Sequence, residues 1–203
     1  MFVTLEIKNA YQMEKELSSK ESLAIITEMI GKAKREAAGD GSFQILLWGW
    51  IISLCNLGHF ALVKMDYSQP YLVWLLVIPA TITSIIYGVR KGQKSRVKTH
   101  LDIVLNQLWI AVFVGIVIVL AFMNILKFNQ SPVILILAAL GMFVTGTLIR
   151  VNMVKIGGVI LAIGSVIAFT LPVIDQYLVS GIAIVLGYLV PGYYLKKSYR
   201  ERV

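Results

Sequence analysis

The residues best suited to chemistry are few, and two of them lie close together in an apolar stretch. Cys55 and His59 stand four residues apart, which places a thiol nucleophile and an imidazole base on one helical face. No carboxylate accompanies them to orient the imidazole, so packing is the better interpretation. The chain has one cysteine and two histidines, and it contains no HExxH, GxSxG, phosphate-loop or dinucleotide motif. We therefore expect no enzyme activity, no cofactor and no metal site.

Uncharged polar residues within apolar stretches form a second candidate site. Asn56 and His59 share a helical face, and Thr81 and Thr83 follow Pro79, which should kink the helix that contains it. All four side chains are candidates to line a cavity. In the structural interpretation, Thr81 and Thr83 reach the carbonyl that the kink frees, and the Asn56 and His59 face hydrogen-bonds a neighbouring helix. The second interpretation is favoured, because a polar group at membrane depth is costly unless it is paired.

The elements that must position these residues are membrane-spanning helices. Six stretches without Lys, Arg, Asp or Glu are each long enough to cross the bilayer, which takes roughly 20 residues. The sequence predicts an all-α polytopic protein with a cytoplasmic segment at residues 1–40, a six-helix domain at 41–195 and a basic tail at 196–203. The expected spans are residues 43–63, 69–89, 104–126, 131–149, 156–173 and 176–195.

The charges between the spans predict the orientation of the chain. Of its 19 basic residues, 17 lie in the N-terminal segment, in alternate loops and in the tail, and basic loops face the cytoplasm. Both termini are therefore expected in the cytoplasm. The basic loop from Arg90 to Lys98 is expected to meet anionic headgroups. Membrane orientation explains the pI of about 9.6, so we do not expect nucleic-acid binding.

The segment before the first span predicts an amphipathic helix at about residues 19–38. Ser18 and Glu21 fit a capping box, and the sequence Gly39-Asp40-Gly41 should end the helix. One face carries an apolar stripe, formed by Leu23, Ile26, Met29, Ile30 and Ala33. Three destinations for this stripe stay open: the membrane interface, the cytoplasmic ends of the bundle, or another protein.

Small residues four apart predict close helix contacts in the last two spans. The pairs are Gly158 with Ala162, Gly164 with Ala168, and Ala183 with Gly187. These faces are also candidate contacts for a homo-oligomer.

Short motifs near both ends of the chain resemble those of an uncharacterised family of small six-span inner-membrane proteins of Bacteroidota. They include Leu46-Leu47-Trp48-Gly49-Trp50, Ile156-Gly157-Gly158 and the run from Gly187 to Gly192. The resemblance implies a bacterial plasma membrane location, and genes of this type lie near small winged-helix regulators. It implies no activity.

Two functions of different classes follow. The first, which we favour, is a membrane-anchored signalling or interaction protein that uses its N-terminal helix to bind a cytoplasmic regulator. The alternative is a small permease or channel for an uncharged or lipophilic solute, with Asn56, Thr81 and Thr83 along the path. The absence of charged residues from the spans argues against ion-coupled transport.

Overall fold

The computed structural model describes the backbone of residues 2–94 and 100–200, and the side chains of residues 21–29, 41–90, 93 and 100–198. Within these ranges the chain consists of helices and turns, with no strand. It divides into two compact units, Met1–Glu36 and Ala37–Val203.

Helix α1, Phe2–Lys64, belongs to both units. The prediction that a separate helix begins near Ser19 and ends at Gly39-Asp40-Gly41 is therefore wrong. A glycine inside a helix costs only about 1 kcal/mol relative to alanine, and each further residue of an existing helix adds a hydrogen bond. Gly41 also lacks the positive φ of a helix-terminating glycine.

Six helices in the described part of the chain are long and apolar enough to cross a membrane, which confirms the predicted all-α polytopic fold. Their bounds are Gly41–Lys64, Pro70–Arg90, His100–Ala121, Gln130–Leu148, Asn152–Phe169 and Val173–Ser198. The first span is the end of α1. The others are built from η1 (Pro70–Leu76) with α2 (Val77–Lys94), α3 (His100–Ala121), α4 (Gln130–Leu148), α5 (Asn152–Phe169), and α6 (Val173–Ile184) with η2 (Val185–Leu189) and α7 (Val190–Arg200).

Local turn geometry moves several boundaries from their predicted places. The third span ends at Ala121 and not at residue 126, because turns follow it and Lys127 and Phe128 adopt positive φ angles of 49° and 65°. The fifth ends at Phe169, and Pro172 is the N-cap of α6. In the sixth, η2 is a short π-helix between α6 and α7.

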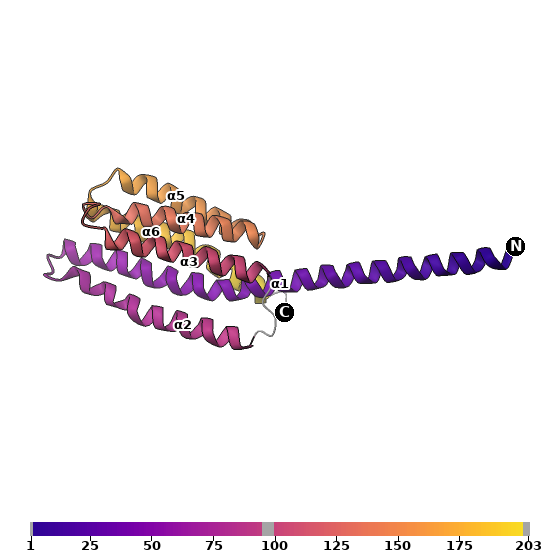
Figure 1. Cartoon of the computed structure of the whole chain (residues 1–203). Coiled ribbons are helices and arrows are strands. Elements are labelled where there is room, and N and C mark those ends of the chain that lie inside the picture. The colour runs from indigo at the N-terminus through magenta and orange to yellow at the C-terminus, as the bar shows by residue number, and fades with distance from the viewer. Residues whose placement is uncertain (1, 95–99, 201–203) are drawn as a thin grey trace. The chain divides into compact units, whose positions relative to one another are not determined.

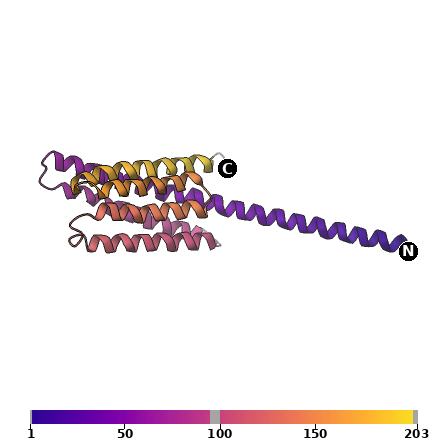
Figure 2. The same ribbon diagram turned by 90° about the horizontal axis from the view of Figure 1, so that it is seen from above.

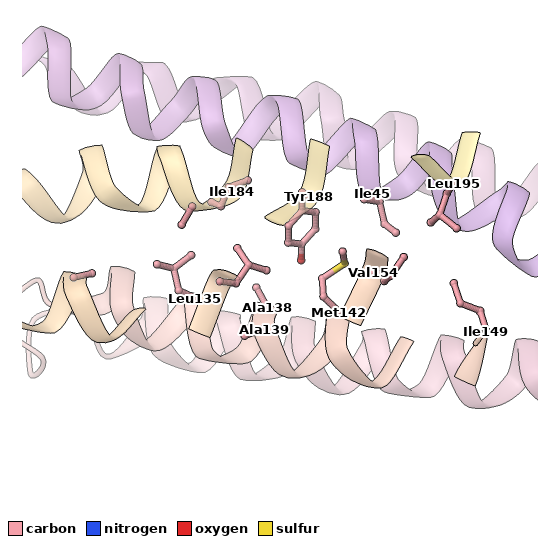
Figure 3. Close-up of a cluster of buried hydrophobic side chains, with 13 residues drawn as sticks. Ile45, Leu135, Ala138, Ala139, Met142, Ile149, Val154, Ile184, Tyr188 and Leu195 are labelled. Carbon is pink, nitrogen blue, oxygen red and sulfur yellow. The ribbon is translucent and has the colours of Figure 1, made fainter. Parts of the chain in front are cut away.

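The core of the second unit lies among α1, α4, α5 and the sixth span (Figures 1 and 2). Figure 3 shows the Tyr188 ring of η2 pointing toward the side chains of Ala139 and Met142 on α4. Leu161 of α5 and Leu195 of α7 are buried in the same cluster. This cluster is the apolar centre of the four-helix arrangement.

Spans two and three lie at the periphery of this arrangement. Only 6% of the apolar window in each is buried, against 50% in α4. The second span is held to α1 by the stacked rings of Phe43 and Tyr87, 4.2 Å apart, and by a hydrogen bond of 2.8 Å from the Ser84 hydroxyl to the Gln44 side-chain oxygen. Most of its apolar surface is left for lipid.

Close helix approach occurs where the sequence places small residues. A Cβ on Gly164 would lie 2.5 Å from the Cβ of Ala183, and a Cβ on Gly157 would collide with the Gly187 carbonyl oxygen. Ala162 departs from the pattern, because its side chain is exposed.

Candidate functional site

One end of the bundle holds the loops at 65–69, 122–129 and 170–172, and is called the loop end below (left in Figure 1). Polar and aromatic side chains from α1, η1, α4 and α6 meet there. Helix α1 ends in a Schellman motif, in which Asp66 adopts a φ of 53° and the Tyr67 amide bonds the Leu62 carbonyl over 3.0 Å. This turn returns the chain as η1 beside the end of α1.

His59 is the centre of an aromatic group at the loop end. Its Nδ1 accepts a hydrogen bond of 3.3 Å from the Trp74 indole nitrogen. The imidazole packs on the Tyr177 ring, with 4.2 Å between the ring centres and a 35° interplanar angle. These contacts make His59 a structural link between α1, η1 and α6.

Two amide side chains continue the site across α4 and α6. Gln130 Nε2 donates to the Tyr177 hydroxyl over 3.2 Å. Gln176 Nε2 donates to Asn129 Oδ1 over 2.7 Å and to the Leu171 carbonyl over 3.1 Å. Two neighbouring residues at the start of α4 are thus bonded to two neighbouring residues of α6.

Three oxygens in this region are buried without a hydrogen-bond partner in the described structure: Gln130 Oε1, Gln176 Oε1 and Ser180 Oγ. Their residues are 8%, 1% and 2% exposed. We call these three residues, together with His59, Trp74, Asn129 and Tyr177, the loop-end polar cluster. The cluster offers hydrogen-bond acceptors and aromatic surface, which suit binding better than acid–base or nucleophilic catalysis.

The structure brings together only two of the four residues of the predicted polar lining, Asn56 and His59. Asn56 is buried against Gly181 of α6, one turn before His59, and donates to the Ile52 carbonyl of its own helix over 2.8 Å. Thr81 and Thr83 instead bond the carbonyls of Val77 and Pro79 in their own helix, each over 2.8 Å. Both hydroxyls bond only their own helix, and Thr83 is exposed, so neither threonine belongs to the loop-end polar cluster.

Pro79 does not kink the middle of a helix. The second span begins as the 3-10 helix η1, and α2 starts at Val77, which places Pro79 in the first turn of α2. The missing proline amide costs little in a first turn. Where the sequence predicts a kink at Pro79, the structure has a change of helix type at Val77, just before the proline.

The Cys55 thiol is a hydrogen-bond donor to the Val73 carbonyl over 3.4 Å, and its side chain is buried. It packs toward η1, as His59 does at Trp74. No group of three or more His, Cys, Asp or Glu side chains among the described residues could hold a metal ion.

The predicted partner-binding stripe lies in the first unit. Leu23, Ile26 and Met29 are helical and 65%, 52% and 66% exposed. The side chains of Ile30 and Ala33 lie outside the described residues. The predicted lipid-binding loop runs from Arg90 to Lys98. Arg90 is exposed at the end of the second span, and residues 95–99 lie outside the described part of the chain.

Sequence reasoning missed most of the loop-end polar cluster. Trp74 fits the aromatic belt of any membrane interface, and the polar pairs Asn129-Gln130 and Gln176-Tyr177 lie at the starts of two predicted spans, where polar residues are to be expected. The available signal was the presence of amide side chains at the starts of two predicted spans: Asn129 and Gln130 before one, and Gln176 at the other.

Comparison of the chain with family models, with curated proteins and with solved structures found no match.

Proposed function

We propose that the chain is a membrane-anchored signalling or interaction protein whose N-terminal helix binds a cytoplasmic protein. The observation that carries the proposal is the exposure of Leu23, Ile26 and Met29, each more than half exposed on one helix. Large apolar side chains gathered on an exposed surface mark interaction sites.

The charge of the N-terminal unit favours a protein partner over a lipid surface. Residues 1–36 contain six basic and six acidic side chains, so their formal charge is 6 − 6 = 0. Helices that lie on membranes are rich in Lys and Arg and gain electrostatic attraction to anionic lipids. This segment lacks that attraction, whereas mixed charges around an apolar stripe are typical of a helix that binds a protein groove.

Anchoring is assigned to the six spans and to the basic loop beginning at Arg90. Each basic residue near an anionic surface contributes about 1 kcal/mol, and the segment from Arg90 to Lys98 contains five basic residues and no acidic one. We place the protein in a bacterial plasma membrane, with the N-terminal helix and the C-terminus in the cytoplasm.

The alternative, a permease or channel, has less support from the structure. Its two arguments in the second span were the kink at Pro79 and the hydroxyls of Thr81 and Thr83. Pro79 lies in a first turn, and the two hydroxyls bond their own helix. Asn56 and the loop-end polar cluster are the observations that still favour a polar path.

Co-purification from membranes in mild detergent tests the proposal. Three forms are compared: the wild type, Ile26→Asp on the apolar stripe, and Ala24→Asp, which adds the same charge on the opposite side of the helix. We expect a cytoplasmic protein to be retained by the wild type and by Ala24→Asp, and to be lost from Ile26→Asp at equal membrane insertion.

The retained protein is then purified and titrated against each form in proteoliposomes. A loss of affinity of at least an order of magnitude for Ile26→Asp alone supports the proposal. Equal binding by all three forms, or no retained protein in any of them, contradicts it.

A further inference from the structure

The loop-end polar cluster contains an excess of buried acceptors. Gln130 Oε1 and Gln176 Oε1 can only accept hydrogen bonds, and the Ser180 hydroxyl can do either. A buried polar atom without a partner costs about 1–3 kcal/mol. Three such atoms in one region would cost a large share of the stability of an ordinary domain, unless a bound molecule supplies the donors.

The hydrogen bonds place these three side chains at one junction. Gln176 is bonded to Asn129, the neighbour of Gln130, and Gln130 is bonded to Tyr177, the neighbour of Gln176. Ser180 lies one turn after Gln176 on α6, so it belongs to the same helical face. The two glutamines therefore lie where the start of α4 meets α6, and Ser180 follows one turn further along the same face of α6.

Turning the Gln130 side-chain amide still leaves one of its polar atoms without a partner. In the opposite orientation Oε1 would accept from the Tyr177 hydroxyl, and the Nε2 donor would lose its partner. Gln176 has no such freedom, because both of its partners, Asn129 Oδ1 and the Leu171 carbonyl, accept hydrogen bonds and must face Nε2.

The occupant that fits this junction is uncharged. An ion buried there would need a compensating charge. Two charged side chains on the helices of the site, Lys64 of α1 and Asp175 of α6, are paired with each other over 3.8 Å. A hydroxyl group can donate to an amide oxygen and can also accept from Ser180.

We propose that the junction of α4 and α6 binds a small uncharged hydroxylic molecule on Gln130 Oε1, Gln176 Oε1 and Ser180 Oγ. Water is the smallest molecule of this class, and an internal water makes about three such bonds. The site stands independently of the N-terminal helix and of its partner.

The protein contains a matched pair of tyrosines that can test the site. Tyr177 and Tyr188 are 9% and 8% exposed, but Tyr177 belongs to the loop-end polar cluster and Tyr188 to the apolar cluster (Figure 3). Radiolysis of water by X-rays in proteoliposomes oxidises side chains next to bound water. We expect Tyr177 to be oxidised several-fold faster than Tyr188, and equal rates would overturn the proposal.

Two variants show whether the three oxygens hold the molecule. Gln176→Leu and Ser180→Ala each remove one acceptor, and either should bring the Tyr177 rate toward that of Tyr188. Thr147→Val is the control, because the Thr147 hydroxyl bonds its own helix over 2.9 Å at an exposed position, and it should leave the ratio unchanged. A ratio that survives both acceptor variants would mean that Tyr177 is oxidised from bulk solvent, and the proposal would fail.

Glycerol distinguishes the two sources of the hydroxyl group. It scavenges radicals in bulk solution and lowers both rates equally, so the ratio of Tyr177 to Tyr188 reports on the site itself. A ratio unchanged by glycerol assigns the site to water, and a saturable fall in the ratio assigns it to a hydroxylic solute.

Discussion

The indole nitrogen of Trp74 donates a hydrogen bond to Nδ1 of His59 over 3.3 Å, and this bond joins the 3-10 helix η1 to the end of α1. The same imidazole packs on Tyr177 at 4.2 Å. Trp74 in turn lies 6.4 Å from Tyr177, measured between ring centres. Three elements are therefore locked together at the loop end by one aromatic group, and the peripheral second span is positioned by it.

A double-mutant cycle of Trp74→Phe and His59→Leu measures this bond. Each single change removes one partner of a half-buried hydrogen bond, and such bonds contribute about 1 kcal/mol net. We expect a coupling free energy of unfolding of that size, measured by chemical denaturation in detergent micelles. Strictly additive effects would show that the bond does not hold η1 to α1.

Gly157→Ala should destabilise the contact between α5 and η2. A Cβ at this position would meet the Gly187 carbonyl oxygen and would lie 2.9 Å from Pro191 Cγ, and neither group can move without shifting the backbone. Overpacking of this kind costs about 1–3 kcal/mol. Thermal unfolding in detergent should show the loss as a lower midpoint.

Gly88→Ala is the matched control for that change. Gly88 lies on α2, and a Cβ there would have nothing within 4 Å. Alanine loses less conformational freedom than glycine in a helix, so we expect a gain of about 0.5 kcal/mol. If both variants lose stability equally, the effect comes from losing glycine and not from the close approach of the helices.

The six spans were predictable because their signal is strong and local. A helix surrounded by lipid must satisfy its own backbone, so an apolar run of the right length has few alternatives. The helix ends were less predictable. Gly39 and Gly41 suggest a stop, but α1 continues through both of them. Residues 122–126 are apolar enough for a span, and yet they form turns.

The loop-end polar cluster was mostly hidden from sequence reasoning, because its contacts join residues far apart in the chain. Asn56 and His59 were identified as polar residues inside a span. Their helix could be predicted, but not the helices opposite them. Tyr177 lies near the end of a span, where an aromatic ring is expected in any case. Its bond to Gln130 links positions 47 residues apart, and no periodicity in the chain indicates it.

Arg150→Gly should stabilise the turn between α4 and α5. Arg150 adopts a φ of 59° in a Schellman motif, where the Val151 amide bonds the Gly146 carbonyl over 2.9 Å. A residue with a Cβ pays roughly 1–2 kcal/mol for this conformation, and glycine avoids that cost. We expect the free energy of unfolding of Arg150→Gly, measured by chemical denaturation, to exceed that of Arg150→Ala by about 1 kcal/mol. Both changes remove the charge, so the difference comes from the φ angle. Equal stability of the two variants would contradict the role given to the φ angle.

Cysteine labelling tests the orientation of the chain and, with it, the proposed partner. Ser68 is exposed in the turn after span one, and Gln93 is exposed at the end of α2, beyond span two. The native Cys55 is 0% exposed, so background labelling should be low. The basic loops predict that an impermeant maleimide labels Ser68→Cys in intact cells and labels Gln93→Cys only after lysis. With six spans, the N-terminal helix lies on the same side of the membrane as Gln93. Labelling of Gln93→Cys from outside would therefore place Leu23, Ile26 and Met29 outside the cytoplasm, and a cytoplasmic partner could not reach them.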